Sequence, residues 1–134
     1  MNLLVDTSVW SLALRRDGEP SEPAVGYLVR ALAEGDSIFT TGLILQELLQ
    51  GFRGPKARES ILERFKPLPL LVPERRDHVA AAELRNRCRR RGLQVGTIDA
   101  LLAALAIRHQ LRLLTSDRDF DRIAAVEPLE LWGG

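Results

Sequence analysis

The sequence has few of the residues on which several common kinds of protein depend. It contains a single cysteine, which excludes an internal disulfide framework and a metal site built from several cysteines. No apolar run reaches the roughly 18 residues that a membrane-spanning helix needs, and the first residues lack the basic segment of a signal peptide. The glycine motifs of Rossmann and P-loop nucleotide sites do not occur. We therefore expect a cytoplasmic protein with no membrane span.

An excess of charge of one sign is missing as well. The chain has 19 basic and 18 acidic residues, a formal net charge of +1, which argues against a protein whose whole surface binds nucleic acid. Hydrophobic residues make up 46% of the chain, too many for a disordered polypeptide. The length of 134 residues suits one compact domain, so we expect residues 1–134 to form a single domain.

Short apolar strands alternate with helices along the chain. Strands are predicted at residues 2–5, 37–41, 68–73, 112–115 and 129–131. Helices are predicted at residues 9–15, 23–34, 42–52, 56–65, 76–91, 97–109 and 119–124. The clearest loop is the Gly- and Pro-containing stretch at residues 15–23. This alternation predicts an α/β fold with a parallel central sheet of four or five strands flanked by helices.

Four acidic residues fall where a parallel sheet binds its ligands, beyond the carboxyl ends of its strands. Asp6 directly follows the first predicted strand, and Asp117 comes two residues after the RLLT strand. Asp99 lies in the first turn of an Ala- and Leu-rich helix, and Glu47 interrupts another apolar helix. The positions predict that the four side chains meet at one edge of the sheet.

Each acid also has a local explanation. Asp6 would cap the helix that follows it, and Asp99 would complement the dipole of its own helix. Asp117 would form a turn, and Glu47 would be a solvated position on an amphipathic helix. These local explanations are independent of one another, whereas a shared site predicts all four positions together.

Four carboxylates at one edge would repel one another and take up protons unless a cation were present. A divalent ion makes the ionised cluster favourable, and an all-oxygen ligand set selects Mg²⁺ or Mn²⁺ over zinc. Such an ion lowers the pKa of bound water and neutralises charge on a phosphoryl group. The acids therefore predict hydrolysis of phosphodiester bonds by metal-activated water.

Four segments resemble, in order, the motifs of PIN-domain nucleases: VDTSVW, LILQELLQGF, GTIDALLAALAI and LLTSDRDFDRI. The likeness runs over nearly the whole chain and is greatest to the VapC-type toxins of toxin–antitoxin operons. It implies that Asp6, Glu47, Asp99 and Asp117 form the family's catalytic quartet, which holds one or two Mg²⁺ or Mn²⁺ ions, and that the enzyme is an endoribonuclease. A non-catalytic PIN-like module that binds protein or RNA is the alternative.

The resemblance also implies partners. It implies a homodimer and a VapB-type antitoxin, with the apolar helices around residues 25–32 and 43–49 as interface and groove. Simple core burial is the other explanation for these apolar positions. The first of the two helices carries the following residues on one face: Val25, Leu28, Val29 and Leu32.

Four further residues lie near the quartet in the sequence. Asp119 is sometimes counted in the family's cluster, but we expect it to cap the helix at residues 119–124, with Phe120 in the core. Thr7, Ser8 and Thr115 match polar positions of the family, and their hydroxyls either orient the acids or cap local backbone.

Arginine supplies 17 of the 19 basic residues. Five of them crowd one helix end, namely Arg85, Arg87, Arg89, Arg90 and Arg91. This group is either a patch that contacts RNA phosphates or a solvated helix face. On the same helix we expect Ala80, Leu84 and Cys88, spaced four apart, to face the core.

Overall fold

The computed structural model describes residues 2–15 and 22–133, so most of the predicted loop at residues 15–23 lies outside the described residues. The elements in chain order are β1 (Leu3–Val5), α1 (Thr7–Leu14), α2 (Pro23–Glu34), β2 (Ile38–Thr41), α3 (Gly42–Gly51), α4 (Pro55–Phe65), β3 (Leu70–Leu71), α5 (Arg75–Arg90), α6 (Thr97–Arg108), β4 (Arg112–Leu114) and α7 (Asp119–Val126). In the described part of the chain, no helix is both long and apolar enough to cross a membrane.

The four strands form a parallel sheet in the order β3-β2-β1-β4. The central strand β1 pairs with β2 and with β4, and all three of its residues are fully buried. Strands that are covered on both faces read as continuous apolar runs, which is why the LLV segment signalled a buried strand. The predicted α/β fold with a parallel sheet is confirmed.

Several predicted boundaries are wrong, most of them by one or two residues. The first helix begins at Thr7 rather than at residue 9, directly after Asp6. The strand predicted at residues 68–73 is reduced to Leu70–Leu71 by the prolines that flank it, since proline donates no ladder hydrogen bond. The last predicted strand is a single bridge between Leu113 and Leu131.

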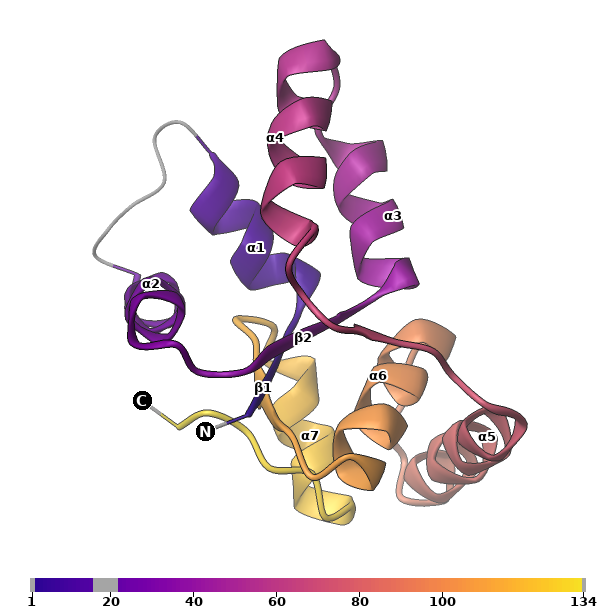
Figure 1. Ribbon diagram of the computed structural model, residues 1–134. Coiled ribbons are helices and arrows are strands. Elements are labelled where there is room, and N and C mark those ends of the chain that lie inside the picture. The colour runs from indigo at the N-terminus through magenta and orange to yellow at the C-terminus, as the bar shows by residue number, and fades with distance from the viewer. Residues whose placement is uncertain (1, 16–21, 134) are drawn as a thin grey trace.

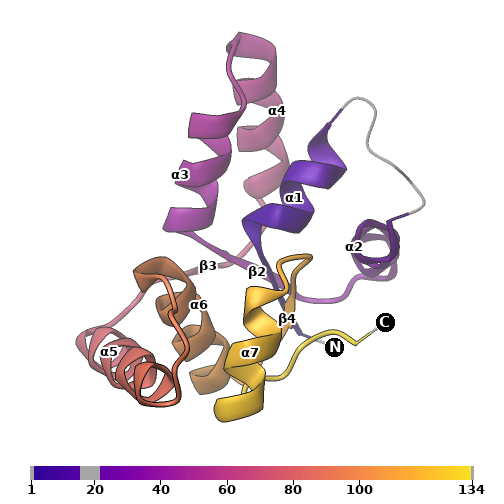
Figure 2. The same ribbon diagram turned by 180° about the vertical axis from the view of Figure 1, so that it is seen from behind.

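The helices lie on two sides of the strands. Figure 1 and the reverse view in Figure 2 show α1, α3 and α4 above the strands and α5, α6 and α7 below them. Helix α6 is the most enclosed, with Ala100 to Ala106 all buried, as its Ala- and Leu-rich sequence predicted. Its burial fixes the position of Asp99 in its first turn.

Helix α5 packs on α6 through a stripe that differs by one residue from the predicted one. Ala81, Leu84 and Cys88 are buried, whereas Ala80 is exposed. Alanines at three successive positions give no periodic signal, and the buried set follows the alternating spacing of three and four that one face of a helix requires. Asp77 begins the buried stripe, and this residue is only 1% exposed.

A buried ion pair fixes the relative direction of the two helices. Arg108, at the end of α6, donates from Nε to Asp77 Oδ1 at 2.5 Å and from Nη2 to Asp77 Oδ2 at 2.8 Å. Asp77 lies in the first turn of α5, so α5 and α6 run antiparallel. Near the other end of the pair, Arg85 donates from Nε to the Val95 carbonyl in the connecting loop at 2.6 Å. The start of α6 therefore lies beside the end of α5.

Helix α2 buries fewer of its large apolar side chains than the sequence pattern predicted. Its core face consists of Ala24, Val25, Leu28 and Ala31. Val29 is 58% exposed and Leu32 is 46% exposed. Core burial therefore explains Val25 and Leu28 but leaves the other two apolar side chains at the surface.

Candidate metal centre

The acids that follow β1 and β4 are brought together by the sheet. These strands are parallel neighbours, so their carboxyl ends share one edge. The Asp6 amide donates to the Leu114 carbonyl at 2.9 Å, which ties Asp6 to the end of β4. Asp117 follows that strand three residues later, as the sequence predicted.

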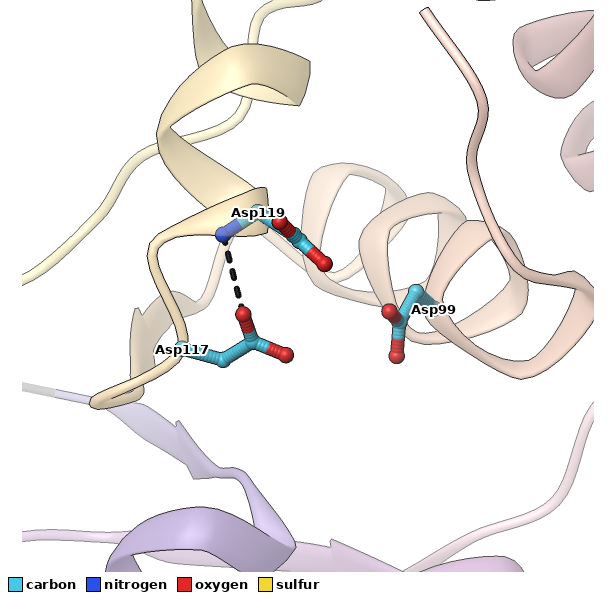
Figure 3. Close-up of side chains that lie close together, drawn as sticks. All are labelled: Asp99, Asp117 and Asp119. Carbon is cyan, nitrogen blue, oxygen red and sulfur yellow. Dashed lines mark hydrogen bonds between the residues drawn. The ribbon is translucent and has the colours of Figure 1, made fainter.

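Three aspartates come close enough to hold one cation. Asp99, Asp117 and Asp119 each offer a carboxylate oxygen, and these three oxygens lie within 4.8 Å of one another. Figure 3 shows Asp117, in the loop before α7, and Asp119, the first residue of α7, turned toward Asp99 on α6. Oxygen donors alone are the ligand set that a hard divalent cation such as Mg²⁺ prefers, so the residues present fit a divalent metal.

Asp119 does not cap its helix, and that prediction is wrong. It is the first residue of α7, and the capping position belongs to Arg118, which makes no side-chain cap. The Asp119 amide instead donates to Asp117 Oδ1 at 2.9 Å, so the Asp117 side chain satisfies the turn and the Asp119 carboxylate is left to face the other acids. The second half of the prediction is confirmed, because Phe120 is fully buried.

Asp6 is held by two hydroxyl groups. The buried carboxylate accepts at Oδ2 from Ser8 Oγ at 2.8 Å and from Thr115 Oγ1 at 2.9 Å. It makes no side-chain cap on α1, so the capping explanation for Asp6 is wrong. Thr115 Oγ1 also accepts from the Asp117 amide at 3.0 Å, and this hydroxyl thus links two acids of the site.

Glu47 joins the site from the middle of α3. Thr7, the first residue of α1, donates from Oγ1 to Glu47 Oε1 at 2.9 Å. The glutamate is half-buried, so it is not the solvated position of the alternative explanation. Thr7, Ser8 and Thr115 therefore all contact carboxylates, as the orienting role predicted, and the Ser8 and Thr115 hydroxyls also accept from backbone amides, as the capping explanation predicted.

The charges of the site converge on Asp99. Burial is the largest cause that raises its pKa, from an ordinary 3.8 to about 6, and the charges of Asp6, Asp117, Asp119 and Glu47 add to it. All four neighbours act on one carboxyl, so the five residues form one electrostatic group, here called the acidic cluster. A divalent cation would reverse this unfavourable balance.

The predicted arginine patch is divided in the structure. Arg85 donates to the Val95 carbonyl in the loop before α6. Arg87 forms a bidentate ion pair with Glu127, donating from Nε at 2.9 Å and from Nη2 at 2.6 Å. Residues 89–91 are exposed at the end of α5, beside the start of α6 that carries Asp99. Of the five arginines in the predicted patch, only these three remain candidates for contact with RNA phosphates.

The sequence is similar to known proteins over nearly its whole length. The family model of the PIN domain matches residues 3–126. Ribonuclease VapC11 of Mycobacterium tuberculosis is 35% identical over 130 residues, which cover 96% of each chain. A VapC ribonuclease of Mycobacterium bovis matches with the same identity and coverage.

Solved structures share the fold. VapBC2 from Rickettsia felis, bound to a DNA fragment from their promoter, matches with a TM-score of 0.77 and 22% identity over 98% of each chain. VapBC-1 from nontypeable Haemophilus influenzae matches with a TM-score of 0.76 and 18% identity, over 98% of this chain and 97% of that one. At these identities the structures support the architecture alone.

Proposed function

The chain belongs to the PIN-domain family, and from that premise we propose that it is an endoribonuclease that serves as the toxin of a toxin–antitoxin pair. The observation that carries this proposal is the meeting of Asp99, Asp117 and Asp119 within 4.8 Å of one another, in a chain 35% identical to VapC ribonucleases. We expect residues 1–134 to act as one domain in the cytoplasm.

The catalytic residues proposed are Asp6, Glu47, Asp99 and Asp117, which would hold Mg²⁺, with Mn²⁺ as the alternative. The position of Asp119 beside Asp99 and Asp117 supports its addition as a fifth member. When bound, such an ion makes water a better nucleophile near neutral pH and offsets charge on the phosphate.

The chain's own hydroxyls hold the carboxylates in place before any ligand arrives. Ser8 and Thr115 fix one oxygen of Asp6 from two elements, and Thr7 fixes Glu47. Hydrogen bonds of this kind orient ligand side chains and make them less mobile. The Asp117 side chain braces the first turn of α7 and so sets the position of Asp119.

Two further features support the proposed protein partners, a VapB-type antitoxin and a second copy of the chain. Val29 and Leu32 form an exposed apolar surface on α2. A hollow of about 350 Å³ lies between α5 and α6, with Leu43 and the exposed Ile98 among its lining residues. Apolar surface of this kind is typical of protein-binding faces.

The proposal is tested by RNA cleavage in Mg²⁺ with matched acid-to-amide variants. Asp99→Asn is expected to lower kcat by about 100-fold or more, because it weakens the hold on the proposed cation, which would activate water and offset charge on the phosphate. Asp121→Asn is the control, since Asp121 is exposed on the same helix as Asp119 but stands outside the acidic cluster. RNA binding without cleavage by the wild type would favour the non-catalytic module instead.

A further inference from the structure

Arg122 shares the rim of the acidic cluster. It lies on α7 one turn after Asp119, and both residues line a small cavity of about 20 Å³ together with Asp99 and residues 93–96. The cavity is too small for a nucleotide, but its lining places Arg122 beside Asp99 and Asp119, two proposed metal ligands. The side chain itself is exposed.

The Arg122 guanidinium has no ion pair or hydrogen bond within residues 2–15 and 22–133. This is notable because Asp119 stands three residues earlier, a spacing at which side chains on a helix are neighbours. Arg87 and Arg108 do bind carboxylates of the fold. Arg122 therefore differs from them in keeping its charge free at the edge of an acidic pocket.

The negative charge of the acidic cluster suggests a role for the unpaired Arg122 guanidinium. Five ionised carboxylates exceed the charge of even two divalent cations, so the loaded site would still be net negative. A polyanionic strand approaching it would be repelled unless a fixed cation lay beside the carboxylates. Arginine suits this position because its planar fork of donors matches the oxygens of a phosphate.

We propose that Arg122 binds a backbone phosphate of the RNA substrate beside the acidic cluster and so positions the strand for cleavage. This inference rests on the proposed ribonuclease function. Arg122 contacts the substrate away from the bond that is cut, so its contribution belongs to substrate binding more than to the chemical step.

The test is steady-state cleavage of a random-sequence pool of single-stranded RNA oligonucleotides in Mg²⁺ at several salt concentrations. Arg122→Ala is expected to raise KM roughly tenfold and to leave kcat within about twofold. It should also make the fall of log(kcat/KM) with log salt shallower by about 0.7, the slope for one single-strand phosphate contact. Arg122→Lys keeps the charge and should restore the slope and part of the KM.

Arg75→Ala is the matched control, because Arg75 is exposed and lies at the far end of α5 from the loop that lines the cavity. Arg75→Ala should change neither the KM nor the slope of log(kcat/KM) against log salt. All three variants should have the same melting temperature as the wild type. If the wild type cleaves RNA but Arg122→Ala behaves as Arg75→Ala does, the role of Arg122 is refuted and the proposed function stands. If the wild type cleaves no RNA, both fail.

Discussion

The Asp99 carboxylate is surrounded by groups that disfavour its charge. Its pKa in the fold, about 6 against an ordinary 3.8, lies above the value in the unfolded chain. The stability that protonated Asp99 contributes is thus fully present below about pH 3.8 and is lost as the pH rises through about 6. At neutral pH the metal-free protein carries this unfavourable charge, which a bound divalent cation would offset.

Asp99→Asn should therefore stabilise the metal-free protein. The amide resembles the protonated acid, so we expect a gain on the order of 1 kcal/mol at pH 7, after allowance for screening of a partly exposed group, and none below pH 3.8. Thermal unfolding in EDTA at both pH values measures this difference. Asp121→Asn should show no such pH-dependent gain, and a loss of stability in Asp99→Asn at pH 7 would contradict the account.

Thr115 tests whether a hydroxyl group positions Asp6. Thr115→Val keeps the shape but removes the bonds to Asp6 and to the Asp117 amide. We expect the affinity for Mg²⁺ to fall by about 10- to 100-fold, so that a correspondingly higher Mg²⁺ concentration is needed for cleavage. This is the usual cost of losing a hydrogen bond to a metal ligand. The measurement is the Mg²⁺ concentration at half-maximal cleavage.

Thr40→Val is the control for that substitution. The Thr40 hydroxyl is buried in β2 and has no hydrogen-bond partner among the described residues, so its removal should leave Mg²⁺ dependence unchanged and stability equal or higher. An equal response of the two variants would mean that Thr115 has no special role.

At the scale of helices, the pair of α5 and α6 determines where Asp99 stands. The Arg108 guanidinium holds the pKa of Asp77 below its ordinary value, chiefly through their hydrogen bonds. The stability from this ion pair is present above about pH 3.8 and is lost as the pH falls through the still lower pKa of the folded state. The ion pair therefore stabilises the helix pair over the pH range in which Asp99 is ionised.

Asp77→Ala should lower the free energy of unfolding by about 3 kcal/mol at pH 7, because it leaves a guanidinium without its buried partner and removes a helix cap. Urea unfolding at pH 7 and at pH 3 measures the loss, which should shrink at the lower pH. The exposed pair of Glu63 and Lys66 provides the comparison, and Glu63→Ala should cost less than 1 kcal/mol. Equal costs for the two variants would contradict the assigned role.

Sequence predicted these elements well where local signals were strong. Pro23 at the start of α2 and Gly35, with a φ of 79° at its end, mark a helix by backbone chemistry alone. The ion pair of Asp77 with Arg108 joins residues 31 positions apart, and no local pattern reveals it. A contact of this kind is invisible to a reading of local sequence, and it is what sets the direction of α6 against α5.

Four of the five members of the acidic cluster were predicted from sequence, because their positions carry local signals. Strand ends and an apolar helix start are visible in sequence, and they indicated Asp6, Asp99 and Asp117. The direction of the Asp119 carboxylate depends on the Asp117 side chain, which accepts from the Asp119 amide. The backbone amide of Asp117 in turn donates to the Thr115 hydroxyl. The paired spacing of Asp117 and Asp119 was the only local signal for the fifth acid.

At the scale of the whole molecule, the near-zero net charge conceals a separation of signs. Five acids gather at one edge of the sheet, and exposed arginines at the end of α5 and on α7 lie on elements beside them. Without the acids of the cluster the chain is net basic. An overall charge of +1 is thus compatible with a protein that binds a polyanion locally.

The central claim is that this acidic cluster cleaves RNA only with a divalent cation bound. The most direct test is cleavage of RNA by the wild-type protein in excess EDTA, followed by addition of Mg²⁺ beyond the chelator. The account predicts that cleavage stops in EDTA and returns with Mg²⁺. Cleavage that continues at an unchanged rate in EDTA would contradict it.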